Sequence, residues 1–128
     1  MPRRSHFALH ALSLALAVGI AIALIEPVPP RLENATQGSA FPYDKLVHFV
    51  LFLVAAFPWR RSLAALGAKS PGVAVVVTAA VYGGLLEVVQ GLWTRRDAEL
   101  LDMVAGALGA LAAIAILRLV AARRAPQP

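Results

Sequence analysis

Four apolar runs take up most of this 128-residue chain, and they constrain the fold more than any other feature of the sequence. Short segments that contain proline, glycine and charged residues separate them. The runs are residues 7–25, 41–59, 73–93 and 100–120. An α-helix needs roughly 20 mostly apolar residues to cross the hydrocarbon core of a bilayer. The sequence therefore predicts four membrane-spanning helices in one domain, residues 1–128.

Local signals suggest where these helices begin and end. Pro58 is expected to close the second helix, because proline lacks the backbone N–H of a helix interior. Residues 70–72, Ser-Pro-Gly, predict a turn before the third. Trp59 and Trp93 are expected to anchor helix ends at the membrane interface. The first run has 19 residues, longer than the roughly 7–15 of a signal-peptide core, so an uncleaved span is expected.

Composition excludes the main alternatives to a membrane protein. The chain is 59% hydrophobic and 15% charged, with a mean hydropathy of +0.72, whereas soluble domains have about 45–50% apolar and about 25% charged residues. A soluble chain of this size could not bury so much apolar surface, and a disordered chain would be far less hydrophobic. The absence of cysteine excludes disulfides, thiol catalysis and cysteine-ligated metal sites.

Charge predicts the orientation. With both termini and the loop between the second and third runs on one side, that side carries eight basic residues and no acidic one, and all seven acidic residues lie toward the other side. The positive-inside rule then places both termini in the cytoplasm. We therefore expect an all-α, four-helix membrane bundle with both termini cytoplasmic. No nucleic-acid binding is expected, because the basic residues flank the spans and form no stripe with aromatic residues.

Polar residues within the runs gather near the predicted outer ends of the last three helices. They are Asp44, Lys45, His48, Glu87, Gln90 and Asp102. Asp44 and His48 are four residues apart, and Glu87 and Gln90 are three apart, so each pair shares a helix face. An ionised residue within a membrane span is costly and usually faces the bundle interior, where it has a partner. The spacing thus predicts an inward-facing polar cluster.

Each of these residues also has a plainer interpretation. Asp44 and Asp102 could simply mark helix starts, where the helix dipole favours an acid. His48 could be a neutral histidine bonded to a carbonyl, and Gln90 could hold two helices together. Glu87 is the hardest to explain in this way, because a lone carboxyl group at that depth is costly.

The polar residues also form an ordered pattern. It reads Asp44-Lys45-x-x-His48-Phe49, then Glu87-x-x-Gln90, then Arg96, then Asp102-x-x-Ala105-Gly106-x-x-Gly109. This resembles the VanZ-like family of bacterial membrane proteins, which typically shows D-K-x-x-H-F, E-x-x-Q, an arginine at the spacing of Arg96, and D-x-x-A-N-x-x-G. Gly106 departs from the pattern, because it stands where asparagine is usual. The resemblance implies a protein of the bacterial inner membrane, in a family whose namesake is linked to teicoplanin resistance.

The preferred functional hypothesis is an envelope protein that binds a lipid-linked or cell-wall headgroup at its outer face. Lys45 and Arg96 would hold phosphate or carboxylate groups, and His48 with Glu87 would form a proton-transfer pair, since histidine titrates near neutral pH. The binding residues expected beside that pair are Asp44, Lys45, Gln90, Arg96 and Asp102. Partners other than membrane lipids and such a precursor are not predicted.

Alternatives from other classes stay open. The cluster could be structural, in a protein that assists a partner. A small transporter is less favoured, because the ionisable residues form no complete path through the inner halves of the spans. A metal ion held by His48, Glu87 and Asp102 is weaker still, since one histidine and no cysteine would give modest zinc affinity, so no metal or cofactor is predicted. No nucleophile elbow or P-loop occurs, and His10 and the serines are expected to have no role in the cluster.

Overall fold

The described part of the chain folds into four long helices and no strand. The structure is a computed structural model that describes residues 3–26, 42–93 and 99–124. Its helices are α1 (Arg3–Ile25), α3 (Tyr43–Ala65), α4 (Pro71–Trp93) and α5 (Leu100–Arg124). Each is long and apolar enough to cross a membrane. The all-α prediction is confirmed, and the chain is a multi-pass membrane protein.

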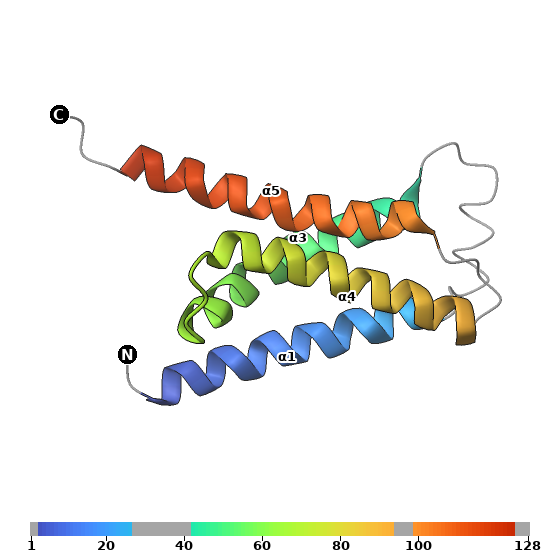
Figure 1. Cartoon of the computed structure of the whole chain (residues 1–128), viewed down its shortest axis with the longest axis horizontal. Helices are drawn as coiled ribbons and strands as arrows, with labels where there is room; N and C mark the ends of the chain where they lie inside the picture. Colours follow the sequence, from blue (N-terminus) through green and yellow to red (C-terminus); the bar gives the residue numbers. More distant parts are fainter. Residues whose placement is uncertain (1–2, 27–41, 94–98, 125–128) are drawn as a thin grey trace.

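The helices alternate in direction, so that α1 begins and α5 ends at the same end of the bundle (Figure 1). We call this the basic end, because Arg60, Arg118 and Arg124 lie there, and the opposite one the acidic end, where α3 and α5 begin. α3 packs most extensively against α5, whereas α1 packs on α3 and α4. Which end faces the cytoplasm stays a prediction.

All four helices extend past the predicted apolar runs at the basic end. α1 starts at Arg3, α3 ends at Ala65, α4 starts at Pro71 and α5 ends at Arg124. At the acidic end none of them extends beyond its run. Long basic side chains keep their stems along apolar surface while the charge reaches water, so a helix can continue into the interface there.

Pro58 does not close its helix, so that prediction is wrong. α3 continues through Pro58, although proline removes one internal hydrogen bond. In a membrane the freed backbone has no water to bond to, and neighbouring helices stabilise the interrupted one. On the C-terminal side of the proline, Trp59 Nε1 donates to the backbone oxygen of Ser13 over 2.9 Å, and Ser62 Oγ hydrogen-bonds with His10 Nδ1. Both contacts attach this part of α3 to α1.

The prediction of an interfacial anchor fails for Trp59 as well. Its side chain lies in the core, 6% exposed, with ring centroids 6.0 Å from Phe52 and 5.7 Å from Tyr82 in edge-to-face arrangements. Tryptophan is buried readily when its N–H finds a partner, and the Ser13 carbonyl supplies one. Trp93, by contrast, is 82% exposed at the end of α4.

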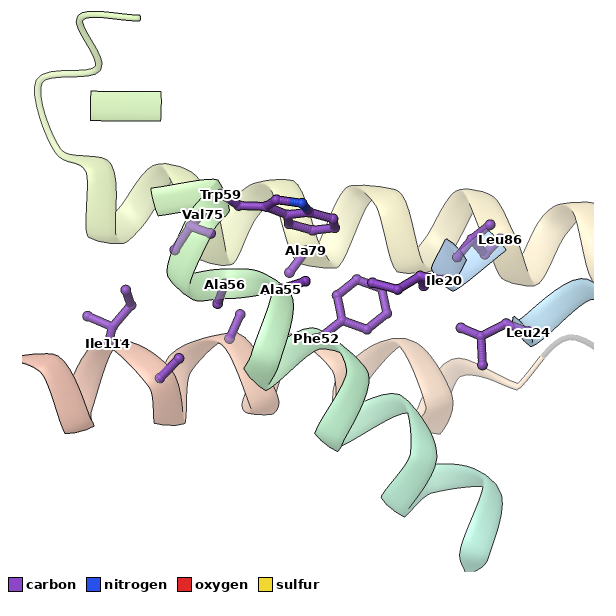
Figure 2. Close-up of a cluster of buried hydrophobic side chains, with 12 residues drawn as sticks. Ile20, Leu24, Phe52, Ala55, Ala56, Trp59, Val75, Ala79, Leu86 and Ile114 are labelled. Carbon is purple, nitrogen blue, oxygen red and sulfur yellow. The ribbon is translucent and has the colours of Figure 1, made fainter. Parts of the chain in front are cut away.

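The core of the bundle combines five alanines with larger side chains (Figure 2). The buried hydrophobic residues are Ile20, Leu24, Phe52, Ala55, Ala56, Trp59, Val75, Ala79, Leu86, Ala110, Ala113 and Ile114. Small side chains allow membrane helices to approach closely. The approach is closest at Gly109 of α5, where an added Cβ would lie 2.1 Å from the backbone oxygen of Phe49 in α3. This contact sets the acidic-end starts of α3 and α5 beside each other.

Candidate functional site

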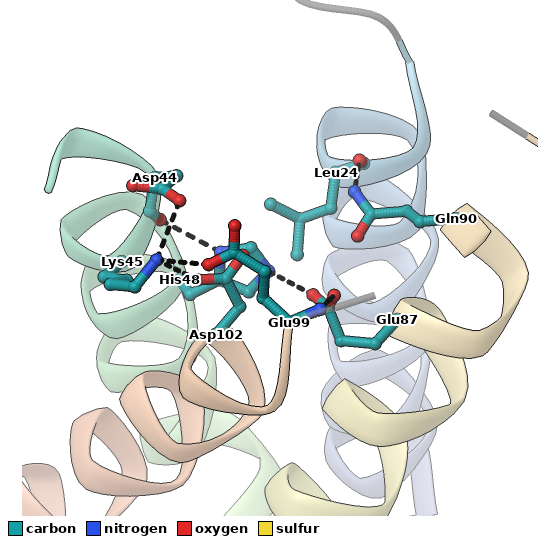
Figure 3. A network of polar contacts seen from close by, with 8 residues as sticks. All are labelled: Leu24, Asp44, Lys45, His48, Glu87, Gln90, Glu99 and Asp102. Carbon is teal, nitrogen blue, oxygen red and sulfur yellow. Dashed lines mark hydrogen bonds and ion pairs between the residues drawn. The ribbon is translucent and has the colours of Figure 1, made fainter. Parts of the chain in front are cut away.

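At the acidic end, side chains from α3, α4 and the start of α5 meet in one network (Figure 3). We call it the acidic cluster, and its members are Asp44, Lys45, His48, Glu87, Glu99 and Asp102. His48, Glu87 and Asp102 are buried, each 4–5% exposed. Five of the seven residues predicted for the site thus lie together, and the predicted inward orientation of the buried three is confirmed.

Lys45 lies among three carboxylates. Its Nζ is 3.0 Å from Oδ2 of the adjacent Asp44, 2.6 Å from Glu99 Oε2 and 3.2 Å from Asp102 Oδ1. An ammonium has three donor hydrogens and no acceptor. The protein's own carboxylates therefore surround the group that the sequence suggested would hold a phosphate, and Lys45 links α3 to α5.

His48 uses its two ring nitrogens differently. Nδ1 lies 3.0 Å from the backbone oxygen of Asp44, one helical turn earlier. Because a carbonyl oxygen only accepts, Nδ1 is the donor. Nε2 points across to α4 and lies 3.2 Å from Glu87 Oε1, but the two atoms do not form a hydrogen bond. Nδ1 thus makes the carbonyl contact of the plainer interpretation, and Nε2 faces Glu87 as the predicted pairing requires.

Glu87 connects α4 to the start of α5. Its Oε2 accepts a hydrogen bond of 3.0 Å from the backbone N–H of Glu99, the residue just before α5. The positive end of a helix dipole favours a carboxylate there. The close approach of α4 and α5 continues one turn earlier, where a Cβ on Gly84 would lie 3.1 Å from Met103 Sδ. A residue with no side chain at this point lets Glu87 reach α5.

Gln90 and Arg96 are the two remaining predicted site residues. Gln90 is buried one turn beyond Glu87, but its Nε2 donates to the backbone oxygen of Leu24 in α1, and Figure 3 shows its side chain reaching to Leu24. Arg96, and Arg95 beside it, lie outside the described residues. Gln90 therefore attaches α1 to α4.

Sequence reasoning missed Glu99 as a member of the cluster. Glu99 lies outside the apolar runs, where a charge costs little, so its position along the chain does not indicate burial or a partner. Its spacing of three residues from Asp102 does indicate that the two acids lie close together, because residues at i and i+3 share a helix face. The backbone N–H of Asp102 donates to the Glu99 oxygen over 3.0 Å, which links Glu99, just before α5, to Asp102 in the first turn of that helix.

A second set of polar contacts joins α1 to the rest of the bundle. Trp59, Tyr82 and Gln90 each donate a hydrogen bond to a backbone oxygen of α1, at Ser13, Ala17 and Leu24 respectively. The pair of His10 and Ser62, expected to have no role in the acidic cluster, belongs to this set. The acceptors lie along α1, and the donors come from α3 and α4.

Gly106, the departure from the family pattern, lies beneath an aromatic ring. An added Cβ would lie 3.0 Å from Phe52 Cδ2, and Phe52 is fully buried. The space that a larger residue would occupy is thus filled by Phe52. The glycine and the phenylalanine fit each other, and an asparagine here would require the ring to move.

Two groups of ligand atoms in the acidic cluster are close enough to share one cation. The first is His48, Glu87 and Asp102, and the second is Asp44, Glu99 and Asp102; within each, the ligand atoms lie within 4.8 Å of one another. Lys45 contacts all three members of the second group. No family model, curated protein or solved structure matches this chain, so its chemistry is argued from these residues.

Proposed function

We propose that this chain is a VanZ-like protein of the bacterial inner membrane whose acidic end faces outward and binds the headgroup of a lipid-linked or cell-wall molecule. The observation that carries this proposal is the convergence of His48, Glu87 and Asp102. Three helices bring these residues, distant in the sequence, into one buried cluster at one end of a membrane bundle. Buried ionisable residues in membrane spans mark substrate or ion sites by default.

The cluster favours a headgroup that donates hydrogen bonds. Asp44, Glu87, Glu99 and Asp102 supply acceptor oxygens, and Lys45 already has three carboxylate partners. Ionised carboxylates only accept hydrogen bonds. Sugar hydroxyls and the ammonium groups of peptide stems match such a surface, whereas a phosphate would meet repulsion. Both kinds of donor occur in cell-wall precursors, and binding of such a precursor by this protein would alter glycopeptide susceptibility.

Susceptibility of an expressing host tests the proposal. Cells producing the unmodified chain, Glu87→Gln or Glu26→Gln are compared for teicoplanin resistance at equal membrane protein levels. Glu26 is the matched control, because it undergoes the same chemical change at the same end of the bundle but is exposed. We expect the unmodified chain and Glu26→Gln to protect, and Glu87→Gln to lose protection. Equal protection by all three would remove the acidic cluster from the function.

A structural role is the second candidate, and the ion pairs of Lys45 favour it. They join α3 to the first turn of α5, which holds the bundle closed at this end. Buried ion pairs are nevertheless weak evidence for stability by themselves. If this role were the whole function, Glu87→Gln protein that melts at the unmodified temperature in detergent would protect normally.

A further inference from the structure

Three buried polar atoms of the acidic cluster lack a hydrogen bond. They are His48 Nε2, Glu87 Oε1 and Asp102 Oδ1, and no described residue supplies a partner of hydrogen-bond geometry. Each comes from a different helix, and one ligand atom from each of these three residues lies within 4.8 Å of the other two. Buried polar atoms are almost always satisfied in native proteins. Asp102 Oδ1 still lies 3.2 Å from Lys45 Nζ, and His48 Nε2 lies 3.2 Å from Glu87 Oε1, so the unmet requirement is centred on the contact between His48 and Glu87.

The contact between His48 and Glu87 needs a positive charge. Nδ1 of His48 donates to a carbonyl, so Nε2 carries a lone pair when the ring is neutral. That lone pair would face a carboxylate oxygen of Glu87 at 3.2 Å, and two acceptors held this close repel each other. Either a proton on Nε2 or a bound metal ion relieves this repulsion, and a zinc titration distinguishes the two. The backbone contact at Nδ1 is also the contact that usually orients a metal-binding histidine.

The neighbouring group of three carboxylates already has a cation among them. Lys45 Nζ fills the space among Asp44, Glu99 and Asp102, within 2.6–3.2 Å of each. It reaches Asp102 Oδ1 but leaves His48 and Glu87 without a cation. Among the described residues of the cluster, four carboxylates face one ammonium and one imidazole. A divalent ion beside His48 would remove most of the excess negative charge.

We propose that His48 Nε2, Glu87 Oε1 and Asp102 Oδ1 bind a divalent transition-metal ion of the zinc class. Zinc bonds to histidine nitrogen and carboxylate oxygen are about 2.0–2.2 Å long, so the ligand atoms of a tetrahedral site lie about 3.4 Å apart. The 3.2 Å between His48 and Glu87 already fits this geometry, and a small movement of Asp102 completes it. Three protein ligands leave one position for water or a ligand oxygen.

Zinc binding to the purified full-length protein tests the site. Chelator-treated protein in detergent is titrated with ZnCl₂, and bound metal and the melting temperature are measured for the unmodified chain, His48→Gln, Asp102→Asn and Glu26→Gln. We expect one zinc per unmodified chain, and at least about tenfold weaker binding in the first two variants. Glu26→Gln, which changes an exposed acid outside the acidic cluster, should bind normally. Equal binding by all four proteins would overturn the proposal.

Replacing the proposed histidine ligand with cysteine gives a test that does not depend on loss of binding, which a misfolded variant would also show. The chain has no cysteine, so His48→Cys introduces a single thiol at the proposed metal. Cobalt(II) added to the folded variant should produce a thiolate-to-metal absorption band that the unmodified chain lacks, since thiolate is a strong ligand for such ions. Folded His48→Cys protein that binds cobalt without this band would refute the assignment. Neither readout requires a headgroup, so metal binding and headgroup binding can fail separately.

Discussion

The two ends of the bundle use charge in opposite ways. At the acidic end, charged side chains point between the helices, where Glu87 and Asp102 are buried and paired. At the basic end, Arg61, Arg118 and Arg124 are exposed, and every ion pair found among the described residues lies at the other end. An open hollow of about 610 Å³ there, lined partly by Arg118 and Arg124, gives these guanidinium groups access to solvent.

The comparison distinguishes two roles of charge. Exposed bases at helix ends bear on how the helices are oriented in the membrane, whereas buried charges between helices form the acidic cluster. A base at the end of a helix reaches the interface along its own stem and needs no partner. An acid inside a span must find one in the protein. The buried ionisable groups, rather than the number of charges, therefore distinguish the acidic end, on which the proposed function rests.

The largest effect expected from this comparison is in chemical labelling. Because the native chain has no cysteine, Glu26→Cys and Lys69→Cys each carry one reactive thiol, at the exposed acidic and basic ends respectively. A membrane-impermeant maleimide should label Glu26→Cys in intact cells, and Lys69→Cys only after permeabilisation. The reverse pattern would show that the acidic end faces the cytoplasm and would contradict the proposed orientation.

The next effect concerns the contact that keeps the acidic end assembled. Gly109→Val would place side-chain atoms against the backbone oxygen of Phe49, where even a Cβ lies 2.1 Å away. We expect a loss of about 3 kcal/mol or more of stability, since inserted atoms force packed helices apart. Thermal melting in detergent measures it. Gly19→Val is the control, because a Cβ on Gly19 meets nothing within 4 Å, and an equal loss there would show that valine itself is responsible.

A smaller effect is expected at the lysine that joins α3 to α5. Lys45→Met leaves Asp44, Glu99 and Asp102 without their ammonium and should lower stability by about 1–3 kcal/mol, the usual cost of a stranded polar partner. The matched change at the basic end, Lys69→Met, should leave the melting midpoint unchanged, because Lys69 is exposed. If both variants melted alike, the two ends would not differ in the way described.

The apolar runs predicted the four helices because a span of that composition has few other solutions in a membrane. The same reasoning predicted that Asp44, His48 and Glu87 would face inward. Helical spacing gives the face on which a residue lies, but not the neighbour that it meets. For this reason Gln90 was expected in the cluster although it contacts α1. Trp59 was assigned to the interface because sequence alone could not reveal the acceptor on Ser13.

The hydrogen bonds that attach α1 have a consequence for how the protein can evolve. Trp59, Tyr82 and Gln90 recognise the main chain of α1, and every residue offers the same carbonyl whatever its side chain. Substitutions at α1 positions that contribute only a carbonyl should therefore leave these bonds in place, so the identities that matter for them are those of the three donors. Ile20 and Leu24, which pack in the core, and His10, which bonds Ser62, should tolerate less change.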